Sequence, residues 1–255
     1  MAGARPFLIE ARNARVERGG TTILHGISLG LHKGELGVLL GPSGSGKSTL
    51  FKALMGLWPL AGGQVLLEGV PLSEVDPARL TRTIGSVPQD DIVHLDLRLR
   101  RALEYSARLR LPADTPEPTL QAAVDRVLGA LELTERAQVR IRNLSGGQRK
   151  RASMGVELLL APPVLFLDEP TSGLDPELEA GTMRLLRRLA GEGRGVLTTT
   201  HATASLDQAH FTVVVVKGRL AWAGPPQDML GHFQVSDPDL VFKALREAEP
   251  DAWAA

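Results

Sequence analysis

One stretch of this chain combines glycines, a lysine and hydroxyl residues in a pattern suited to holding a triphosphate. The pattern is GxxxxGK[ST], and its positions are filled by Gly41, Pro42, Ser43, Gly44, Ser45, Gly46, Lys47, Ser48 and Thr49. Glycines let consecutive backbone N–H groups converge on phosphate oxygens, and the start of a helix adds its positive dipole end. Lys47 would supply charge to the β- and γ-phosphates, while Ser48 would offer a hydroxyl to Mg²⁺.

The segments on either side of this loop are the elements that must position it. Leu36–Leu40 is an uninterrupted apolar run and predicts a buried strand. Residues 49–57 carry apolar side chains at helical spacings and predict a helix. The alternative, a flexible connector rich in glycine and serine, would not explain this strand–loop–helix context.

Two adjacent acids follow another apolar run. Val164–Leu167 would bury its side chains as a strand, and its C-terminal end would deliver Asp168 and Glu169 to the sheet edge where ligands bind. Asp168 is placed to hold Mg²⁺, directly or through water. Glu169 is placed to polarise a water for in-line attack on the γ-phosphorus. Taken alone, the two acids are equally compatible with a solvated turn.

A second candidate anion site lies far along the chain, in the run LSGGQ. Ser145 is a predicted N-cap, and Gly146 and Gly147 would expose N–H groups at the start of a helix. One chain has little use for two separate grips on one triphosphate, whereas two chains placed head to tail could use both on each nucleotide. The alternative is an ordinary capped helix.

The composition limits the classes of protein. The 255 residues include 29 basic and 29 acidic ones, and this zero formal charge argues against a general nucleic-acid binder. The chain contains no cysteine, which excludes disulfides and thiolate metal sites and fits a reducing compartment. No apolar run reaches the roughly 18 residues of a membrane span, and residues 1–6 lack the apolar core of a signal peptide. We therefore expect a soluble chain whose membrane role comes through a partner.

Predicted strands and helices alternate along most of the chain. Strands are predicted at 7–11, 23–31, Leu36–Leu40, 65–67, Ile84–Val87, Val164–Leu167, 196–200, 213–216 and 220–223, with a hairpin turn at 19–20 and a loop at 71–77. Helices are predicted at 49–57, 97–111, about 120–131, about 146–160 and 176–190, with a further candidate at 240–247. This alternation implies an α/β fold with a mainly parallel sheet and a helical insertion at about 90–160.

Six signals in a fixed order carry a resemblance to a known family. They are GPSGSGKST at 41–49, Gln89 in VPQDD, LSGGQRKR at 144–151, VLFLDEP at 164–170, SGLD at 172–175, and His201 after the threonines at 198–200. In combination they resemble the nucleotide-binding domain of an ATP-binding cassette (ABC) transporter, over roughly residues 7–235. The resemblance implies a P-loop NTPase fold whose parallel-sheet core and N-terminal antiparallel β subdomain comprise 7–89 and 161–235. Residues 90–160 would form the ABC-specific helical subdomain, and 236–255 a C-terminal tail.

The resemblance also implies catalytic and metal-binding roles. It implies ATP and Mg²⁺ as cofactors of an ATP hydrolase whose catalytic residues are Glu169, His201 and Gln89. Ser48, Gln89 and Asp168 would hold Mg²⁺. Gln89 would also sense the γ-phosphate and move the helical insertion, and His201 would hydrogen-bond that phosphate. Taken alone, Gln89 would more often be a surface loop residue and His201 a strand-end histidine.

A second set of roles joins two copies of the cassette. The phosphate loop would bind the nucleotide from one side, and the signature residues of the partner cassette, Ser145, Gly146, Gly147 and Gln148, would bind it from the other. Asp175 would cross the interface towards the opposite phosphate loop. We therefore expect a homodimer with ATP.

One departure from the family concerns the nucleotide base. Many members carry an aromatic residue upstream of the phosphate loop, on which adenine stacks, whereas residues 14–18 here read ARVER. Val16 could pack on the base, or Arg18 could stack its planar guanidinium there. Loss of a stacking ring would weaken nucleotide binding by about 1–3 kcal/mol.

A finer resemblance points to the G subfamily, whose half-transporters export lipophilic compounds or sterols. It rests on residues 87–91, 103–112, 165–176, 223–226 and 233. It implies export through a transmembrane permease domain or subunit, at the cytoplasmic face of the cell membrane. In those proteins a membrane domain follows on the same chain, so this sequence is either a stand-alone subunit or an excised cassette.

Two other functions compete with transport. A soluble ABC-type ATPase acting on DNA or ribosomes would carry long coiled-coil insertions, or two cassettes joined by a basic linker. A small-molecule kinase sharing the phosphate loop would leave LSGGQ and His201 unexplained. We expect no nucleic-acid partner.

Overall fold

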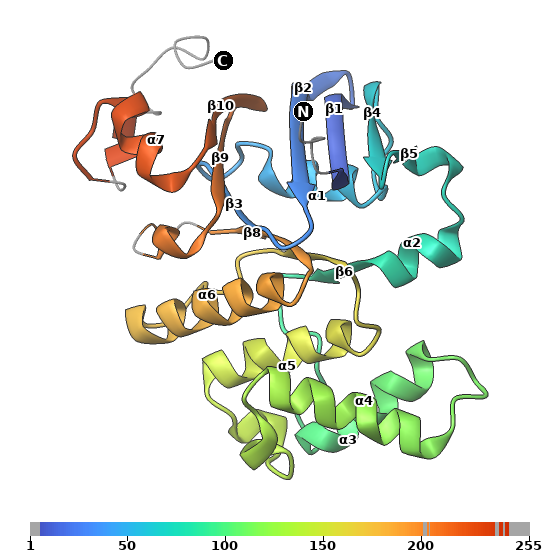
Figure 1. Ribbon diagram of the computed structural model, residues 1–255. Helices are drawn as coiled ribbons and strands as arrows, with labels where there is room; N and C mark the ends of the chain where they lie inside the picture. The colour runs from blue at the N-terminus through green and yellow to red at the C-terminus, as the bar shows by residue number, and fades with distance from the viewer. Residues whose placement is uncertain (1–5, 201–202, 204, 238–239, 242, 245–255) are drawn as a thin grey trace, which may run out of the picture.

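The computed structural model describes residues 6–200, 203, 205–237, 240–241 and 243–244, and Figure 1 shows their arrangement. The strands are β1 (Phe7–Arg18), β2 (Thr21–His32), β3 (Leu36–Leu40), β4 (Gly62–Leu67), β5 (Val70–Pro71), β6 (Ile84–Val87), β7 (Val164–Leu167), β8 (Gly195–Thr199), β9 (Phe211–Val216) and β10 (Arg219–Gly224). The helices are α1 (Lys47–Leu54), α2 (Pro77–Thr83), α3 (Leu99–Arg110), α4 (Glu117–Ala130), α5 (Gly146–Leu158), α6 (Pro176–Gly191) and α7 (Pro226–Phe233).

The larger sheet has six strands in the order β10-β9-β3-β8-β7-β6. Its neighbouring strands are parallel except for β9 and β10, which form an antiparallel pair. Every residue of β3, β7 and β8 is buried, as expected of a parallel sheet covered on both faces. The prediction of a mainly parallel core is confirmed. Because β3 and β7 run in the same direction, the segments that follow them emerge at one edge of the sheet.

The smaller sheet is antiparallel, in the order β2-β1-β4-β5. Gly19 and Gly20 form the predicted turn between β1 and β2, both with left-handed backbone angles (φ 56° and 77°). β1 extends well beyond the predicted strand at 7–11. Its pairing with β2 shifts register between Ala11 and Ala14, and again farther along. These irregularities break the two-residue period that sequence prediction relies on.

The helices lie in layers around the larger sheet (Figure 1). α1 packs between the two sheets, α6 and α5 lie below the larger sheet in this view, and α3 and α4 form the outermost layer. α1 ends at Leu54, so the prediction of a helix over 49–57 was too long, and Leu57 is 65% exposed. Neither α2 nor α7 was predicted as a helix, and only Pro77 of α2 falls in the predicted loop at 71–77. The candidate at 240–247 lies largely outside the described residues.

Alternate residues of the sheet feed two hydrophobic cores. Leu165 and Leu167 of β7 pack into the core shared with α3, α4, α5 and α6. Val164 and Phe166 pack into the core shared with α1 and the antiparallel sheet. Phe166 is fully buried, with its ring centroid 5.2 Å from that of Phe51. Its burial contributes about 1.5–3 kcal/mol relative to an exposed ring.

A glycine in the β9–β10 turn joins the antiparallel sheet to the phosphate loop. Gly218 accepts a hydrogen bond from the His25 N–H (2.9 Å) and donates one to the Ser45 carbonyl (2.8 Å). Its φ is +75°, and a Cβ there would lie 1.9 Å from the Ile23 carbonyl oxygen. We therefore expect Gly218→Ala to lower the free energy of unfolding by about 2–3 kcal/mol, measured by urea denaturation.

Gly129→Ala is the matched control for this substitution. Gly129 lies inside α4 with open space around its Cβ position. Alanine there should raise the free energy of unfolding by about 0.5–1 kcal/mol. A Gly218→Ala protein as stable as the parent would contradict the tight approach of this turn to β2.

Candidate functional site

Glycine is required where the chain leaves β3 and turns into α1. A Cβ on Gly41 would lie 2.2 Å from the Val215 carbonyl oxygen, closer than any side chain tolerates. Gly46 is the N-cap of α1 and has a φ of 106°, which favours glycine. The helix begins at Lys47, so its first N–H groups face the loop as the pattern predicted.

Lys47 holds its ammonium group against the loop. It is 7% exposed, and its Nζ donates to the carbonyls of Gly41 (2.8 Å) and Pro42 (3.0 Å). Burial lowers the pKa of Lys47, while the carboxylates of Glu169 and Asp168 act in the opposite direction. A cation held this way can exchange carbonyl partners for phosphate oxygens without a large movement.

The loop borders a cavity of about 280 Å³. The loop contributes Ser43, Gly44, Gly46, Lys47, Ser48 and Thr49 to the lining. Three other segments contribute Ile23, Gln89 and Glu169. Glu169 and Gln89, predicted as catalytic, therefore lie at the cavity of the predicted phosphate loop. Gly41, Pro42 and Ser45 belong to the loop but are not among the residues that line the cavity. The buried Ser45 hydroxyl has no hydrogen-bond partner among the described residues.

Asp168 lies within reach of the phosphate loop. Its Oδ2 accepts a hydrogen bond from the Ser48 hydroxyl at 3.3 Å, and its Oδ1 accepts one from the Thr199 hydroxyl at 2.7 Å. A hydroxyl and a carboxylate this close suit one Mg²⁺, whose remaining ligands would be phosphate oxygens and water. The described residues contain no group of three acidic or imidazole side chains that would hold a metal by themselves.

Glu169 adopts a strained backbone conformation at the end of β7. Its φ is 48°, in the left-handed region that a non-glycine residue enters at a cost of about 1–3 kcal/mol. The strain is held by a hydrogen bond from the Glu169 N–H to the Thr199 hydroxyl (2.8 Å). Thr199 thus positions both acids. The sequence contained it in the run of threonines before position 201, but no role was predicted for it.

The signature run forms a capped helix start, as predicted. The Ser145 hydroxyl accepts from the Gln148 N–H (3.3 Å), and the Gln148 side chain accepts from the Ser145 N–H (3.1 Å), completing a capping box. Gly146 and Gly147 approach Leu174 and Leu178, which flank the start of α6. None of these signature residues lines the phosphate cavity of its own chain.

Asp175 has a local structural role that was not predicted. Its carboxylate is the N-cap of α6 and accepts a hydrogen bond from the Leu178 N–H at 3.0 Å. Substitution of Asp175 would therefore disturb the helix as well as any contact across a dimer. His201 lies outside the described residues.

A short loop ties the phosphate cavity to the signature helix. The backbone carbonyl of Gln89 accepts a hydrogen bond from the Lys150 ammonium on α5. The Asp91 carboxylate lies 3.8 Å from the Lys150 Nζ and 3.7 Å from the Arg149 Nε, and it accepts a hydrogen bond from the Ser153 hydroxyl (3.4 Å). Sequence reasoning assigned no role to Lys150 or Asp91, because their meeting depends on tertiary structure.

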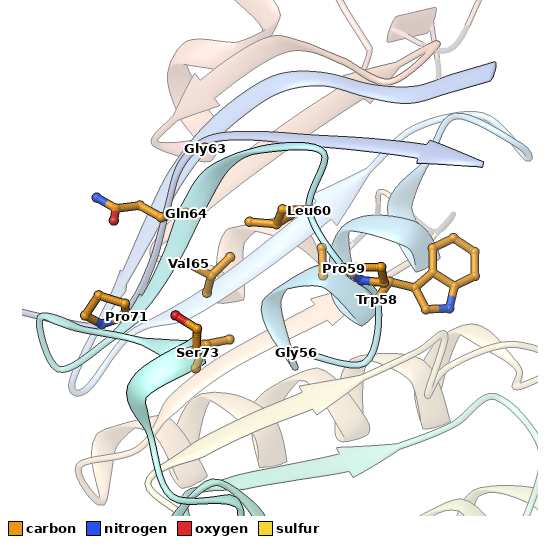
Figure 2. Close-up of a pocket in the computed structure, with 11 residues that line it drawn as sticks. Gly56, Trp58, Pro59, Leu60, Gly63, Gln64, Val65, Pro71 and Ser73 are labelled. Atoms are coloured by element: carbon orange, nitrogen blue, oxygen red, sulfur yellow. The ribbon is translucent and has the colours of Figure 1, made fainter. Parts of the chain in front are cut away.

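A second hollow of similar size lies away from this chemistry (Figure 2). It measures about 280 Å³ and is lined without a charged residue by Ala53, Gly56, Trp58, Pro59, Leu60, Gly63, Gln64, Val65, Pro71, Leu72 and Ser73. A triphosphate needs cationic and N–H partners, so this hollow does not compete with the phosphate cavity as the nucleotide site.

The fold and the cavity together are those of a nucleoside triphosphatase of the phosphate-loop class. The model of the family described as "ABC transporter" matches residues 24–172. The chain therefore belongs to the ABC transporter family, as an ATP-binding domain of the G type, in a family that hydrolyses ATP.

Relatives with similar sequences bear this out. The chain is 46% identical to the ABC transporter ATP-binding/permease protein Rv1747 of Mycobacterium tuberculosis, an alignment that covers 92% of this chain and 27% of that protein. It is 42% identical to ABC transporter G family member 28 of Arabidopsis thaliana, over 80% of this chain and 19% of that protein. It is 32% identical to Nod factor export ATP-binding protein I of Cupriavidus pinatubonensis, over 88% and 68%.

The solved structures agree with the fold. The cbiO1 protein of Clostridium perfringens, described as part of the ABC transporter complex cbiONQ, superposes with a TM-score of 0.84 at 26% identity, covering 95% of this chain and 96% of that one. The chain spans only about a quarter or less of the first two relatives. Among the described helices, none is long and apolar enough to cross a membrane.

Proposed function

We propose that this chain is the motor of a membrane exporter, binding and hydrolysing Mg·ATP between two cassettes and driving a transmembrane partner. The observation that carries this proposal is the separation of two anion-binding devices. The phosphate cavity holds Lys47 and Glu169, while the capped helix start at Ser145 lines no part of it. A head-to-tail pair of chains would bring the Ser145 device of one chain to the cavity of the other.

The residues at the cavity have distinct roles in this proposal. Lys47 and the loop N–H groups bind the β- and γ-phosphates, and Ser48, Asp168 and Gln89 hold Mg²⁺. When bound, the metal neutralises charge on the phosphates. Glu169 accepts a proton from the attacking water as a general base. Signature residues 145–148 and Asp175 of the partner cassette complete the site. His201, which is not among the described residues, would orient the water.

Export through a membrane partner is supported by the named relatives. One is described as an export ATP-binding protein and another as an ATP-binding/permease protein. We infer a location on the cytoplasmic face of the cell membrane. Within the chain, the loop of Gln89 and Asp91 would transmit the presence of the γ-phosphate to α5. A soluble ATPase acting on DNA or ribosomes is not favoured, because these relatives are transporters.

Mixing two inactive variants tests the shared site. Lys47→Ala removes the phosphate-binding lysine of one chain, and Ser145→Arg blocks the helix start at Ser145 of the other. In a heterodimer, one of the two composite sites then keeps both intact halves. Because half of the dimers in an equal mixture are heterodimers, we expect up to about one quarter of the wild-type ATPase rate.

The controls use each variant alone and a double variant. Each single variant should be inactive, and a chain carrying both substitutions should rescue neither. The ATPase assay should be run on the complex purified from membranes with its permease partner. Absence of rescue in the mixture, with both variants folded and dimeric, would refute the shared site.

A further inference from the structure

Four arginines line a cavity in the helical insertion, at the start of α3, which lies in the outermost helical layer (Figure 1). This arginine cavity measures about 490 Å³ and shares no lining residue with the phosphate cavity. Its charged lining residues are Asp96, Arg98, Arg100, Arg101, Glu104 and Arg140. The cations in the lining therefore outnumber the acids by four to two.

Two of these arginines face each other across a short antiparallel pairing. Arg98 and Arg140 form a β-bridge, and backbone hydrogen bonds of 2.9 and 3.0 Å on either side of it join residues 97–99 to residues 139–141. This pattern makes them a non-hydrogen-bonded pair, the kind in which opposite side chains lie closest and the Cα atoms are about 4.5 Å apart. Like charges directly opposite each other destabilise such a pairing. The backbone therefore holds two arginines together at a cost to the fold.

The start of α3 adds to the positive potential of the cavity. Arg98 is the N-cap of α3 and makes no side-chain capping bond, and the first turn has no acidic residue. Arg100 and Arg101 lie in that turn. The N-terminal end of a helix is the positive end of its dipole, where basic side chains are unfavourable and anions are favourable. The helix thus opposes the arginines and favours an anion beside them.

Carboxylates compensate the other charged residues around the arginine cavity. The ion pairs are Arg100–Asp125, Arg101–Glu104 and Arg142–Asp96. In the part of the chain that the structure describes, neither Arg98 nor Arg140 has a carboxylate partner, and the Arg98 guanidinium donates to the Gln138 carbonyl (2.6 Å). Arg98 and Arg140 are both exposed, so a ligand in the cavity can reach them. These two cations are the ones that the fold leaves uncompensated.

We propose that Arg98 and Arg140 bind an anion that carries a phosphate group in the arginine cavity. A guanidinium offers a planar fork of N–H donors that matches two phosphate oxygens, and such charge-assisted bonds are about twice as strong as neutral ones. A tetrahedral phosphate can accept from two forks at once, whereas a carboxylate has only two oxygens. Two sources share this chemistry, namely a soluble phosphate compound and the headgroup of an acidic lipid of the cytoplasmic leaflet.

The bound anion would act on segments that lead to the nucleotide. Residues 97–99 follow the loop of Gln89 and Asp91, and residues 139–141 precede Ser145. An anion between the two arginines would remove their repulsion and so hold these segments together. The inference does not depend on the binding of ATP, because no residue of the phosphate cavity takes part.

Isothermal titration with inorganic pyrophosphate tests the site. The background is Lys47→Ala, so that the phosphate loop contributes little to the signal. We expect Arg98→Gln and Arg140→Gln each to raise the Kd of pyrophosphate about ten- to hundred-fold. Arg140→Lys keeps the charge but loses the fork, and should raise this Kd about three- to ten-fold.

Arg108→Gln is the matched control for these substitutions. Arg108 is an exposed arginine near the other end of α3 and pairs with Glu117 at 2.7 Å. Its replacement changes the net charge by the same amount, and the Kd of pyrophosphate should change less than about twofold. A loss of binding equal to that of Arg140→Gln would show an effect of net charge alone and overturn the proposal.

Urea denaturation gives a second readout that leaves Lys47 in place. Because the two arginines repel each other, Arg140→Gln should unfold at a higher urea concentration than the parent when no phosphate is present. Pyrophosphate should then stabilise the parent more than it stabilises Arg140→Gln, since only the parent keeps both forks. Equal stabilisation of the two proteins would contradict the site.

Co-sedimentation with phosphatidylcholine vesicles, with and without phosphatidic acid, distinguishes the two sources. Binding that requires phosphatidic acid and is lost in Arg98→Gln and Arg140→Gln assigns the site to a lipid headgroup. Binding of pyrophosphate without binding to these vesicles assigns it to a soluble phosphate compound. The proposal is overturned if neither probe binds, or if both arginine variants bind the probes as the parent does.

Discussion

Replacing Glu169 with glutamine is expected to lower the ATPase turnover by about a hundred-fold or more while leaving ATP binding intact. The amide has nearly the shape of the carboxylate but cannot accept the proton of the attacking water. The backbone at Glu169 should keep its left-handed conformation, because the hydrogen bond from its N–H to Thr199 does not involve the side chain. Steady-state phosphate release measures turnover, and titration with ATP measures binding.

The same variant should also change the assembly. Since hydrolysis would reopen the pair of cassettes, a chain that binds ATP without hydrolysing it should remain dimeric during size-exclusion chromatography in Mg·ATP. Glu192→Gln, at the exposed end of α6, is the control and should behave as the parent does. Near-normal turnover by Glu169→Gln would remove Glu169 from the role of general base.

Lys47→Ala should have the largest effect on nucleotide binding. The substitution removes a buried cation that two loop carbonyls hold at the phosphate cavity. Charge-assisted hydrogen bonds to phosphate contribute about 1.5–3 kcal/mol each, so losing them should raise the Kd of ATP by about a hundred-fold or more. Isothermal titration would measure the change.

Thermal unfolding should accompany this measurement, because the substitution also leaves the carbonyls of Gly41 and Pro42 without their partner. Lys33→Ala, an exposed lysine before β3, is the matched control and should bind ATP normally. A folded Lys47→Ala protein with unchanged affinity would show that the cavity does not grip the phosphates through this residue.

The sequence predicted the centre of the fold better than its edges. The strands β3 and β7, which lie inside the six-stranded sheet, were predicted with the bounds that the structure has, because short, sharply bounded apolar runs leave little choice. α2 was missed although Asp76 and Pro77 form a helix start, with Asp76 accepting a hydrogen bond from the Ala78 N–H. This helix buries none of its residues, so no apolar period marked it.

For the site, sequence patterns identified the residues but not how they are held. The phosphate loop, Gln89 and Glu169 were predicted from motifs, and the structure brings them to one cavity. Thr199 supports both Asp168 and Glu169, and Lys150 bonds to the Gln89 carbonyl. No sequence spacing predicts either contact. Their roles arise from contacts between segments far apart in the chain, which periodicity cannot detect.

The link between the Gln89 loop and α5 has a mechanical consequence. Asp91 accepts a hydrogen bond from Ser153, which lies in the middle of the 13-residue helix α5. The N-terminal end of this helix is capped by Ser145. Eight residues of helix separate Ser153 from Ser145, a lever arm of about 12 Å. A rotation of about 10° about that anchor would swing the tip of the lever by about 2 Å. That stroke is comparable to the difference between a made and a broken hydrogen bond, so in the proposed pair of cassettes a small shift of the Gln89 loop would engage or release the phosphate bound by the other chain.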